Sequence, residues 1–287
     1  MTCRILTSLA EVSDRYDAIF CDLWGCYHNG IDVYPAAVAA CQAFRKADGR
    51  VILLTNAPRP AASVKSMLDR MGAPEDSYDQ IVSSGAACQA ALAGGKYGDR
   101  FHYVGPDRDL HMLGDVGLSP VSLERASAIL ITGLRDDRVE TPDDYAADIK
   151  NWVALGLPML CANPDIVVDR GHQRLWCAGA IARDYAAAGG EVIYFGKPHL
   201  PVYDRCHEVL SELTGANTPK SRILAIGDGI VTDVPGGIAA GLDTLFVTGG
   251  LAAQDLGPDP EHPQQELLDA FLAESGLTPA YAIGRLR

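Results

Sequence analysis

Short apolar runs alternate with longer amphipathic stretches along most of this chain, and this alternation limits the possible folds more than any other feature. The first third contains five such segments, in the order strand, helix, strand, helix, strand: 17–22, 35–49, 50–56, 60–72 and 80–84. Pro35 lies in the first turn of the first helical stretch and Gly49 lies past its last turn, as is typical of helix boundaries. Because parallel strands are joined by helices that cover the sheet, this order predicts an α/β fold with a doubly wound parallel sheet.

The same alternation returns after residue 190, and a further set of segments lies in between. The C-terminal set has its strands and helices at 191–196, near 199–213, at 222–228, after Pro235, at 243–250 and near 263–274. The middle set has expected strands at 100–105, 127–133 and 158–163 and an expected helix at 141–156. Small residues and glycines at 83–85 and 190–196 permit linkers. We therefore predict a Rossmann-like core formed by 1–83 and 195–287, with a smaller α/β cap domain, 84–194, inserted between them.

The charge of the chain argues against a nucleic-acid binder, and its sequence shows no expected membrane span, signal peptide or disulfide scaffold. Asp and Glu (37) outnumber Lys and Arg (24), which gives a net charge of −13, whereas a nucleic-acid binder usually carries a basic face. No apolar run reaches the ~18 residues of a membrane span, and the N-terminus lacks the layout of a signal peptide. Eight cysteines without a C-x-x-C pair indicate buried free thiols in a reducing compartment. A cytoplasmic protein with no nucleic acid and no membrane as partner is expected.

Polar side chains stand where four of the expected strands end. They are, in chain order, Asp22, Thr55 with Asn56, Lys197 after the run at 191–196, and Asp228 with Asp233 shortly behind it. Ligands bind outside the carboxyl ends of the strands in doubly wound sheets, so these side chains are expected to meet at one edge. A single Asp at a strand end is usually a turn residue. The joint occurrence of acids, a hydroxyl, an amide and a lysine indicates a chemical site.

Four motifs give the chain a resemblance to a known family. They are DLWGC at 22–26, LLTNAPRP at 53–60, FGKPHLPVY at 195–203 and AIGDGIVTDVPGG at 225–237. Together they resemble the motifs of the haloacid dehalogenase-like (HAD) phosphohydrolases, over residues 17 to 250. The long insertion, with CANPDIVVDRG and then GAIARDYAAAGG, is similar to the large α/β cap of class IIA, the nitrophenylphosphatase-like group. Relatives of this class with tryptophan at the position of Trp24 imply that this residue marks a subfamily.

The resemblance implies a nucleophile and a metal site. Asp22 would attack phosphorus and form an aspartyl-phosphate, which divides one difficult displacement into two easier ones. Mg²⁺ would be bound by Asp22, the backbone carbonyl of Trp24 and Asp228, a small set of oxygen ligands that suits this ion. Asp233 would lie behind these ligands and hold a metal-bound water or orient Lys197.

The remaining motif residues are implied to act on the transferring phosphoryl group. Thr55, with Asn56 beside it, would donate hydrogen bonds to that group, and Lys197 would supply positive charge. The resemblance therefore implies a Mg²⁺-dependent phosphatase that acts on a small phosphorylated metabolite, such as a sugar phosphate. A homodimer formed through the cap would also fit it.

Trp24 departs from the usual first motif of the family, which has a second Asp two residues after the nucleophile. That Asp protonates the leaving oxygen and then activates water, and such help is worth roughly 10²–10⁴ in rate. An indole can only donate its N–H and cannot exchange a proton at neutral pH. Three alternatives stay open. The acid or base could come from elsewhere, with His28 and His199 as candidates, or the substrate could have a leaving group that needs little protonation, such as an acyl or aryl phosphate. In the third alternative the protein binds a phosphometabolite with little or no hydrolysis.

The inserted segment is expected to select the substrate, since a cap that closes over the strand ends covers the leaving group. Its Asn163-Pro164-Asp165 turn resembles the class IIA cap loop that faces the active site. Arg170, His172 and Arg174 follow within a few residues and add positive charge. We expect Asn163, Asp165, Arg170, His172 and Arg174 to contact the substrate.

Overall fold

The computed structural model describes residues 3–170 and 173–287, and its larger sheet, the core sheet, has seven strands within these residues. Their order is β1 (Arg4–Ile5), β13 (Tyr281–Ile283), β12 (Asp243–Val247), β11 (Ile223–Gly227), β2 (Ala18–Asp22), β3 (Arg50–Thr55) and β4 (Gln80–Ser83). Every neighbouring pair is parallel, so the carboxyl ends of β2, β3 and β11 meet at one edge. The predicted doubly wound parallel sheet is confirmed.

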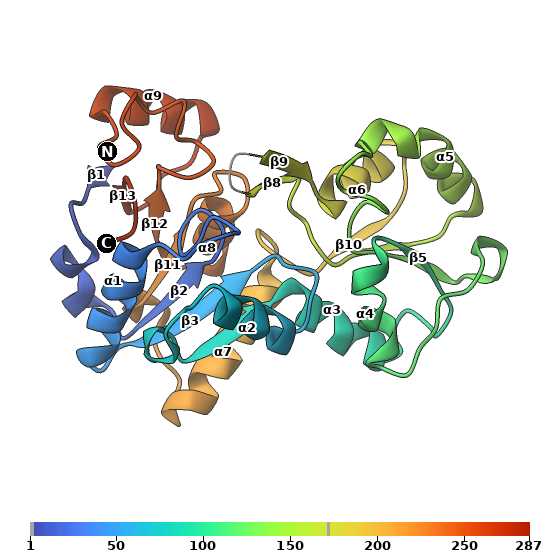
Figure 1. The fold of residues 1–287 in the computed structure, drawn as a ribbon, viewed down its shortest axis with the longest axis horizontal. Helices are drawn as coiled ribbons and strands as arrows, with labels where there is room; N and C mark the ends of the chain where they lie inside the picture. Colours follow the sequence, from blue (N-terminus) through green and yellow to red (C-terminus); the bar gives the residue numbers. More distant parts are fainter. Residues whose placement is uncertain (1–2, 171–172) are drawn as a thin grey trace.

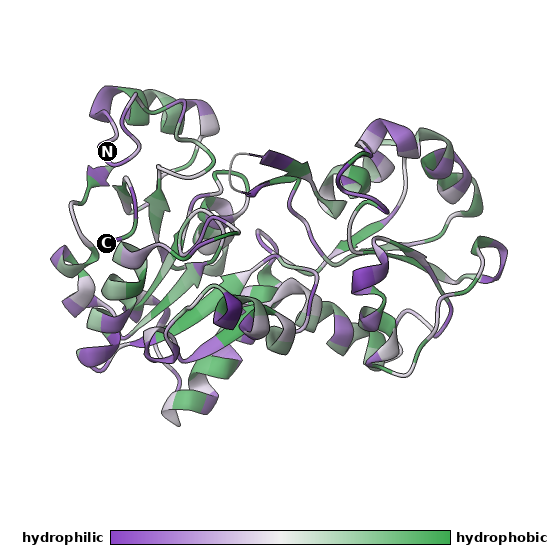
Figure 2. Ribbon diagram, in the orientation of Figure 1, coloured by the Kyte–Doolittle hydropathy of each residue, from purple (hydrophilic) through white to green (hydrophobic). Residues whose placement is uncertain are grey.

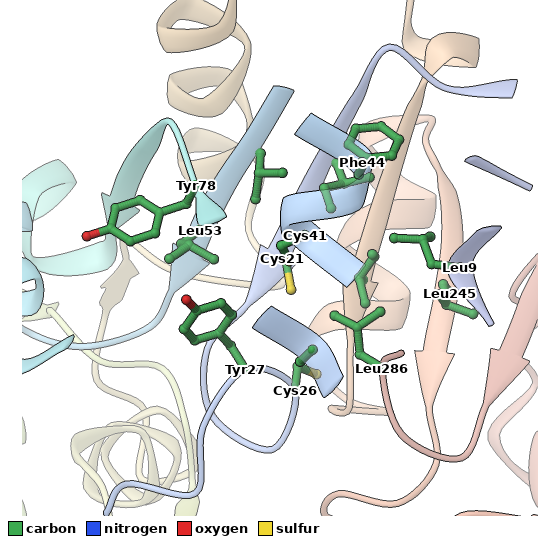
Figure 3. Close-up of a cluster of buried hydrophobic side chains, with 14 of the residues drawn as sticks. Leu9, Cys21, Cys26, Tyr27, Cys41, Phe44, Leu53, Tyr78, Leu245 and Leu286 are labelled. Carbon is green, nitrogen blue, oxygen red and sulfur yellow. The ribbon is translucent and has the colours of Figure 1, made fainter. Parts of the chain in front are cut away.

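Helices cover both faces of the core sheet (Figure 1). Their bounds are α1 (Pro35–Lys46), α2 (Ala61–Arg70), α7 (Leu200–Thr214), α8 (Asp233–Ala240) and α9 (Gln265–Ser275). All five residues of β2 are buried, because alternate side chains face opposite layers: Ile19 and Cys21 pack with α1 and α2, whereas Ala18 and Phe20 pack with α7. Figure 3 shows the first of these clusters, and Figure 2 shows the hydrophobic strands at the centre of the sheet.

The cysteines contribute to these buried layers. The cluster of Figure 3 contains three of them: Cys21 on β2, Cys41 on α1, and Cys26 in the loop between these two elements. All eight cysteines are free and buried, which confirms the expectation of unpaired thiols. In the part of the chain that the structure describes, no helix is both long enough and apolar enough to cross a membrane.

A second, small sheet lies beside the core sheet (Figure 1). Its parallel strands have the order β10 (Val192–Tyr194), β7 (Met159–Cys161), β6 (Ala128–Ile131) and β5 (Phe101–Val104). The helices of this part are α3 (Ser84–Ala93), α4 (His111–Gly114), α5 (Ala146–Leu155) and α6 (Ala178–Ala187). A separate antiparallel pair, β8 (Val167–Arg170) and β9 (Gln173–Trp176), lies between the two sheets in Figure 1. The division into domains at 83/84 and 194/195 stays a prediction.

Two expected elements differ in the structure. The run at 191–196 leads into α7 as expected, but its strand β10 is an edge strand of the small sheet, because it pairs with β7. An apolar run predicts a strand without saying which sheet it joins. Lys197 therefore follows a strand of the small sheet and not a strand of the core sheet. The helix expected after Pro235 begins earlier, at Asp233, since proline is tolerated in a first helical turn, where N–H groups have no partner.

Candidate active site

Lys197 lies buried between two carboxylates from different elements. Its Nζ donates hydrogen bonds to Oδ1 of Asp22, at 2.6 Å, and to Oδ1 of Asp233, at 2.7 Å. The three side chains are only 3%, 8% and 9% exposed, respectively. Burial alone would lower the pKa of Lys197, but the negative charges of Asp22 and Asp233 outweigh it and raise that pKa well above its usual value. The lysine is therefore a fixed positive charge at the end of β2.

Asp233 is the second carboxylate that holds Lys197. It is the first residue of α8, and its Oδ2 accepts hydrogen bonds from the backbone N–H of Gly229, at 3.1 Å, and the hydroxyl of Thr232, at 3.2 Å. Both oxygens of Asp233 are thus engaged. The contact between Lys197 and Asp22 is held in place by this anchored partner.

Asp228 follows β11 and sits in a close-fitting backbone cradle. Its Oδ2 accepts a hydrogen bond from the backbone N–H of Leu251, at 2.9 Å. A Cβ atom added at Gly25 or at Gly250 would lie only 2.0 Å from this oxygen, so both positions require glycine to leave room for the carboxylate. Burial, together with the charge of Asp233, raises the pKa of Asp228 to about 8. The negative charges of the carboxyl groups at this edge of the sheet are therefore not fully balanced by nearby positive charge.

Asp22, Asp228 and Cys26 form the one group of three potential metal ligands found among the described residues. Their ligand atoms all lie within 4.8 Å of one another. Burial raises the pKa of the Cys26 thiol well above its usual value, so this sulfur stays protonated and is a poor ligand for a hard cation. The two carboxylates are the effective donors. Cys26 was not singled out in the sequence, where its only signal is its place at the end of DLWGC.

Thr55 and Asn56 end the neighbouring strand, β3, and differ in what they can do. The Thr55 hydroxyl accepts a hydrogen bond from the backbone N–H of Ala57, at 3.1 Å, which leaves its own proton free to donate. The Asn56 Nδ2 donates to Oδ1 of Asp165, at 2.8 Å, and to the Lys197 carbonyl, at 3.1 Å, while its Oδ1 accepts from the Lys197 N–H, at 2.7 Å. Both amide hydrogens of Asn56 are used. Asn56 thus links Lys197 to Asp165, and its expected role as a donor to the phosphoryl group stays a prediction.

The two histidines expected to replace the missing acid are engaged elsewhere. His28 is fully buried, its Nδ1 accepts a hydrogen bond from the Gly30 N–H, at 2.9 Å, and burial lowers its pKa to about 4. It packs edge-on against Trp24, with ring centroids 5.0 Å apart. His199 stacks on Tyr194 at 4.7 Å. Neither histidine is among the described residues that line the two cavities at this site.

Two cavities meet above the strand ends. The first, here called the carboxylate cavity, has a volume of about 450 Å³ and is lined by Asp22, Thr55, Lys197 and Asp228, among others. The second, here called the outer cavity, has a volume of about 520 Å³ and lies between α2 and the inserted segment. Its lining includes apolar side chains (Met67, Leu175, Trp176) and arginines (Arg59, Arg70, Arg108). Among the described residues, three line both cavities: Trp24, Asp165 and Val168.

Four of the five residues expected to contact the substrate line one or both of these cavities. Asn163 and Arg170 line the outer cavity, and Asp165 lines both. Arg174 lines the carboxylate cavity, where its guanidinium binds the Asp169 carboxylate in two hydrogen bonds of 2.8 and 2.9 Å. His172 lies outside the described residues. Val168 and Trp176, on β8 and β9, were missed, because these strands are short and lack an apolar run.

Comparisons with known proteins agree with this architecture. A sequence model described as haloacid dehalogenase-like hydrolase matches residues 19–119, and one described as HAD-hydrolase-like matches residues 194–273. The crystal structure of a hydrolase of the haloacid dehalogenase-like family from Brucella suis is 38% identical to this chain, with a TM-score of 0.86. The match covers 98% of this chain and 99% of that one.

Two further matches are proteins with named activities. A dihydroxyacetone phosphatase from Corynebacterium glutamicum is 34% identical over 103 residues, which are 36% of this chain and 35% of that protein, so the match spans about a third of this curated relative. A glycerol phosphate phosphatase from Mycobacterium tuberculosis, solved in complex with magnesium, shares the fold at 24% identity and a TM-score of 0.64 over 91% of this chain and 74% of that one. The match to the Brucella suis protein over nearly the whole of both chains confirms the resemblance inferred from the motifs: this chain belongs to the haloacid dehalogenase-like hydrolase family.

Proposed function

We propose that this protein is a Mg²⁺-dependent phosphohydrolase that acts on a small phosphorylated metabolite through an aspartyl-phosphate on Asp22. The observation that carries the proposal is the Asp22 carboxylate at the end of β2, which opens on the carboxylate cavity and is fixed by Lys197 at 2.6 Å. A nucleophilic carboxylate needs such a neighbour, because its own charge repels a phosphate. The named activities of the two phosphatases described above support the same reaction class.

The donor set around Asp22 and Asp228 fits magnesium. Two carboxylates with ligand atoms within 4.8 Å of each other, beside a neutral thiol, favour a hard cation that binds few protein oxygens and keeps several waters. Asp22, Asp228 and the backbone carbonyl of Trp24 would hold it. When bound, the ion supplies positive charge to the phosphate oxygens and offsets the crowding of three carboxylates around one lysine.

The side chains of this site would act together on the phosphoryl group. Lys197 orients the Asp22 carboxylate for attack, and Asp233 keeps the lysine in place. Thr55 has a free hydroxyl proton at the same strand edge and can donate it to a phosphoryl oxygen. The leaving group would extend into the outer cavity, whose volume of about 520 Å³ is ample for a sugar-sized group. Apolar walls and arginines there suit a leaving group with both apolar and polar or anionic parts.

Phosphate release from a panel of substrates tests this function directly. With Mg²⁺ present, we expect turnover of p-nitrophenyl phosphate and of at least one sugar phosphate, triose phosphate or nucleotide. Chelation with EDTA should lower the rate by at least about 100-fold, since the charge at the phosphate is lost, and added Mg²⁺ should restore it. The alternative, a phosphometabolite-binding protein, would show ligand-dependent thermal stabilisation in Mg²⁺ without release of phosphate. That result would contradict the proposed hydrolysis.

The cradle of Asp228 provides a second test. Gly250→Ala should displace this carboxylate, because the new Cβ would lie 2.0 Å from its Oδ2. We expect the Mg²⁺ concentration for half-maximal activity to rise roughly 10–100-fold, the range seen when support of a metal ligand is lost. Gly114→Ala is the matched control, because a Cβ there meets nothing within 4 Å. Equal Mg²⁺ dependence in both variants would contradict the assignment of Asp228 as a metal ligand.

A further inference from the structure

We propose that Asp165 is the proton donor to the leaving group, in place of the acid that the first motif of the family carries where this chain has Trp24. This inference rests on the proposed phosphohydrolase function. It names a residue of the inserted segment, not of the core sheet, as the group that completes the reaction.

The junction of the two cavities carries the argument. In a bound phosphomonoester the phosphoryl group faces Asp22 in the carboxylate cavity, and the leaving group occupies the outer cavity. The oxygen that joins them must then lie where the cavities meet. Among the described residues, Trp24, Asp165 and Val168 line both cavities. An indole and an isopropyl group cannot give up a proton at neutral pH, so Asp165 alone of these three can protonate that oxygen.

Three other acidic side chains at the two cavities pair with arginine, Asp22 and Asp233 pair with Lys197, and Asp228 is assigned to the metal. Asp169 binds Arg174, Asp109 binds Arg59 and Asp137 binds Arg108. The oxygens of these three carboxylates accept hydrogen bonds from guanidinium groups, and none of the three side chains lines both cavities. Asp165 differs, since its hydrogen-bond partner among the described side chains is the neutral amide of Asn56, which donates to Oδ1 at 2.8 Å. Its Oδ2 has no hydrogen-bond partner within the described residues.

The electrostatic surroundings of Asp165 support this role. Burial raises its pKa to about 6, against the smaller lowering effects of Lys197 and the Asn56 hydrogen bond, and Asp233 raises it further. The negative charge of Asp165 also contributes to the raised pKa values of the Cys161 and Cys177 thiols and of the Asp228 carboxyl. A carboxyl with this pKa holds a proton in a useful fraction of molecules near neutral pH and can still release it.

The proton balance is complete without a further reactant. Asp22 forms a bond to phosphorus as the bond from phosphorus to the leaving oxygen breaks, and the electron pair remains on that oxygen. The proton of Asp165 moves to this oxygen and leaves a carboxylate beside Asn56 and near Lys197. In the second step this carboxylate takes a proton from a water whose oxygen bonds to phosphorus as the bond from phosphorus to Asp22 breaks. Phosphate is released, and the Asp22 carboxylate and the protonated Asp165 are regenerated.

Single-turnover rates for a series of phosphate esters, from dinitrophenyl to alkyl, test the proposal. Asp165→Asn keeps an oxygen that can accept the Asn56 hydrogen bond but removes the transferable proton. We expect a loss on the order of 10²–10³-fold for alkyl esters and less than about 10-fold for the dinitrophenyl ester, which needs no protonation. The rate should thus fall more steeply with leaving-group pKa than in the wild type. Asp17→Asn, a surface change outside both cavities, should keep the wild-type slope.

The double variant Trp24→Asp with Asp165→Asn separates proton transfer from a structural effect. The new carboxyl at position 24 also lies where the two cavities meet, so it should raise the rate on alkyl esters at least about 10-fold above that of Asp165→Asn. Two results would overturn the proposal: an equal loss of rate across all esters in Asp165→Asn, or no recovery of rate in the double variant. The proposed function would still stand if turnover depended on Asp22. If the wild type hydrolyses none of the esters, the proposed function itself fails, and this inference with it.

Discussion

Replacing Asp22 by Asn should abolish phosphate release, with a loss on the order of 10⁴–10⁶-fold, as is seen when a catalytic nucleophile is removed. The amide has nearly the same shape and can still accept the hydrogen bond that Lys197 donates at 2.6 Å. It lacks the negative charge needed to attack phosphorus, so no aspartyl-phosphate can form. The rate is measured by phosphate release in Mg²⁺, and the acyl-phosphate is sought by mass spectrometry of the acid-quenched protein.

The matched control is Asp17→Asn, one residue before β2. Asp17 forms an ion pair with Arg222 at 2.5 Å on the surface, with its side chain 52% exposed. A surface pair of this kind contributes little to stability, so this variant should keep wild-type turnover. If Asp22→Asn retained more than about 1% of the wild-type rate, Asp22 would not be the nucleophile, because the loss of a nucleophile lowers the rate far more than about 100-fold.

Replacing Lys197 by Met should lower the free energy of unfolding by about 3–5 kcal/mol in metal-free buffer, in addition to abolishing turnover. Methionine fills a similar volume, but the change leaves the carboxylates of Asp22 and Asp233 buried without their cation. Each now lies within 2.7 Å of the Lys197 Nζ, and both side chains are less than 10% exposed. The loss is measured by urea denaturation in EDTA. Added Mg²⁺ should restore part of the stability, since it binds beside the same carboxylates.

Lys65→Met is the matched control, because Lys65 also contacts two carboxylates, those of Asp69 at 3.0 Å and Glu75 at 2.9 Å. Its side chain is 44% exposed, so water replaces the lost cation and little stability should change. Similar urea midpoints for both variants would show that the buried contacts of Lys197 do not stabilise the fold.

Local sequence was sufficient for the core and for most of the chemical groups. A β-strand buried on both faces leaves a continuous apolar run, and the helix that follows leaves a periodic one, so the α/β core could be predicted. Parallel strands present their carboxyl ends at one edge, which is why Asp22, Thr55 and Asp228 could be placed together before the structure was known. The structure confirms that they line one cavity.

The tertiary structure decided how other residues complete the site. Lys197 reaches Asp22 from the turn that follows β10 of the small sheet, and Asn56 joins Asp165 across 109 residues of sequence. Such contacts leave no periodic pattern, because they depend on how the inserted segment packs on the core. For the same reason the sequence suggested His28 and His199 as acids, while the cavities point to Asp165. The sequence thus determined the core fold and the polar groups at the strand ends, and the packing of the inserted segment on the core determined which residues line the outer cavity.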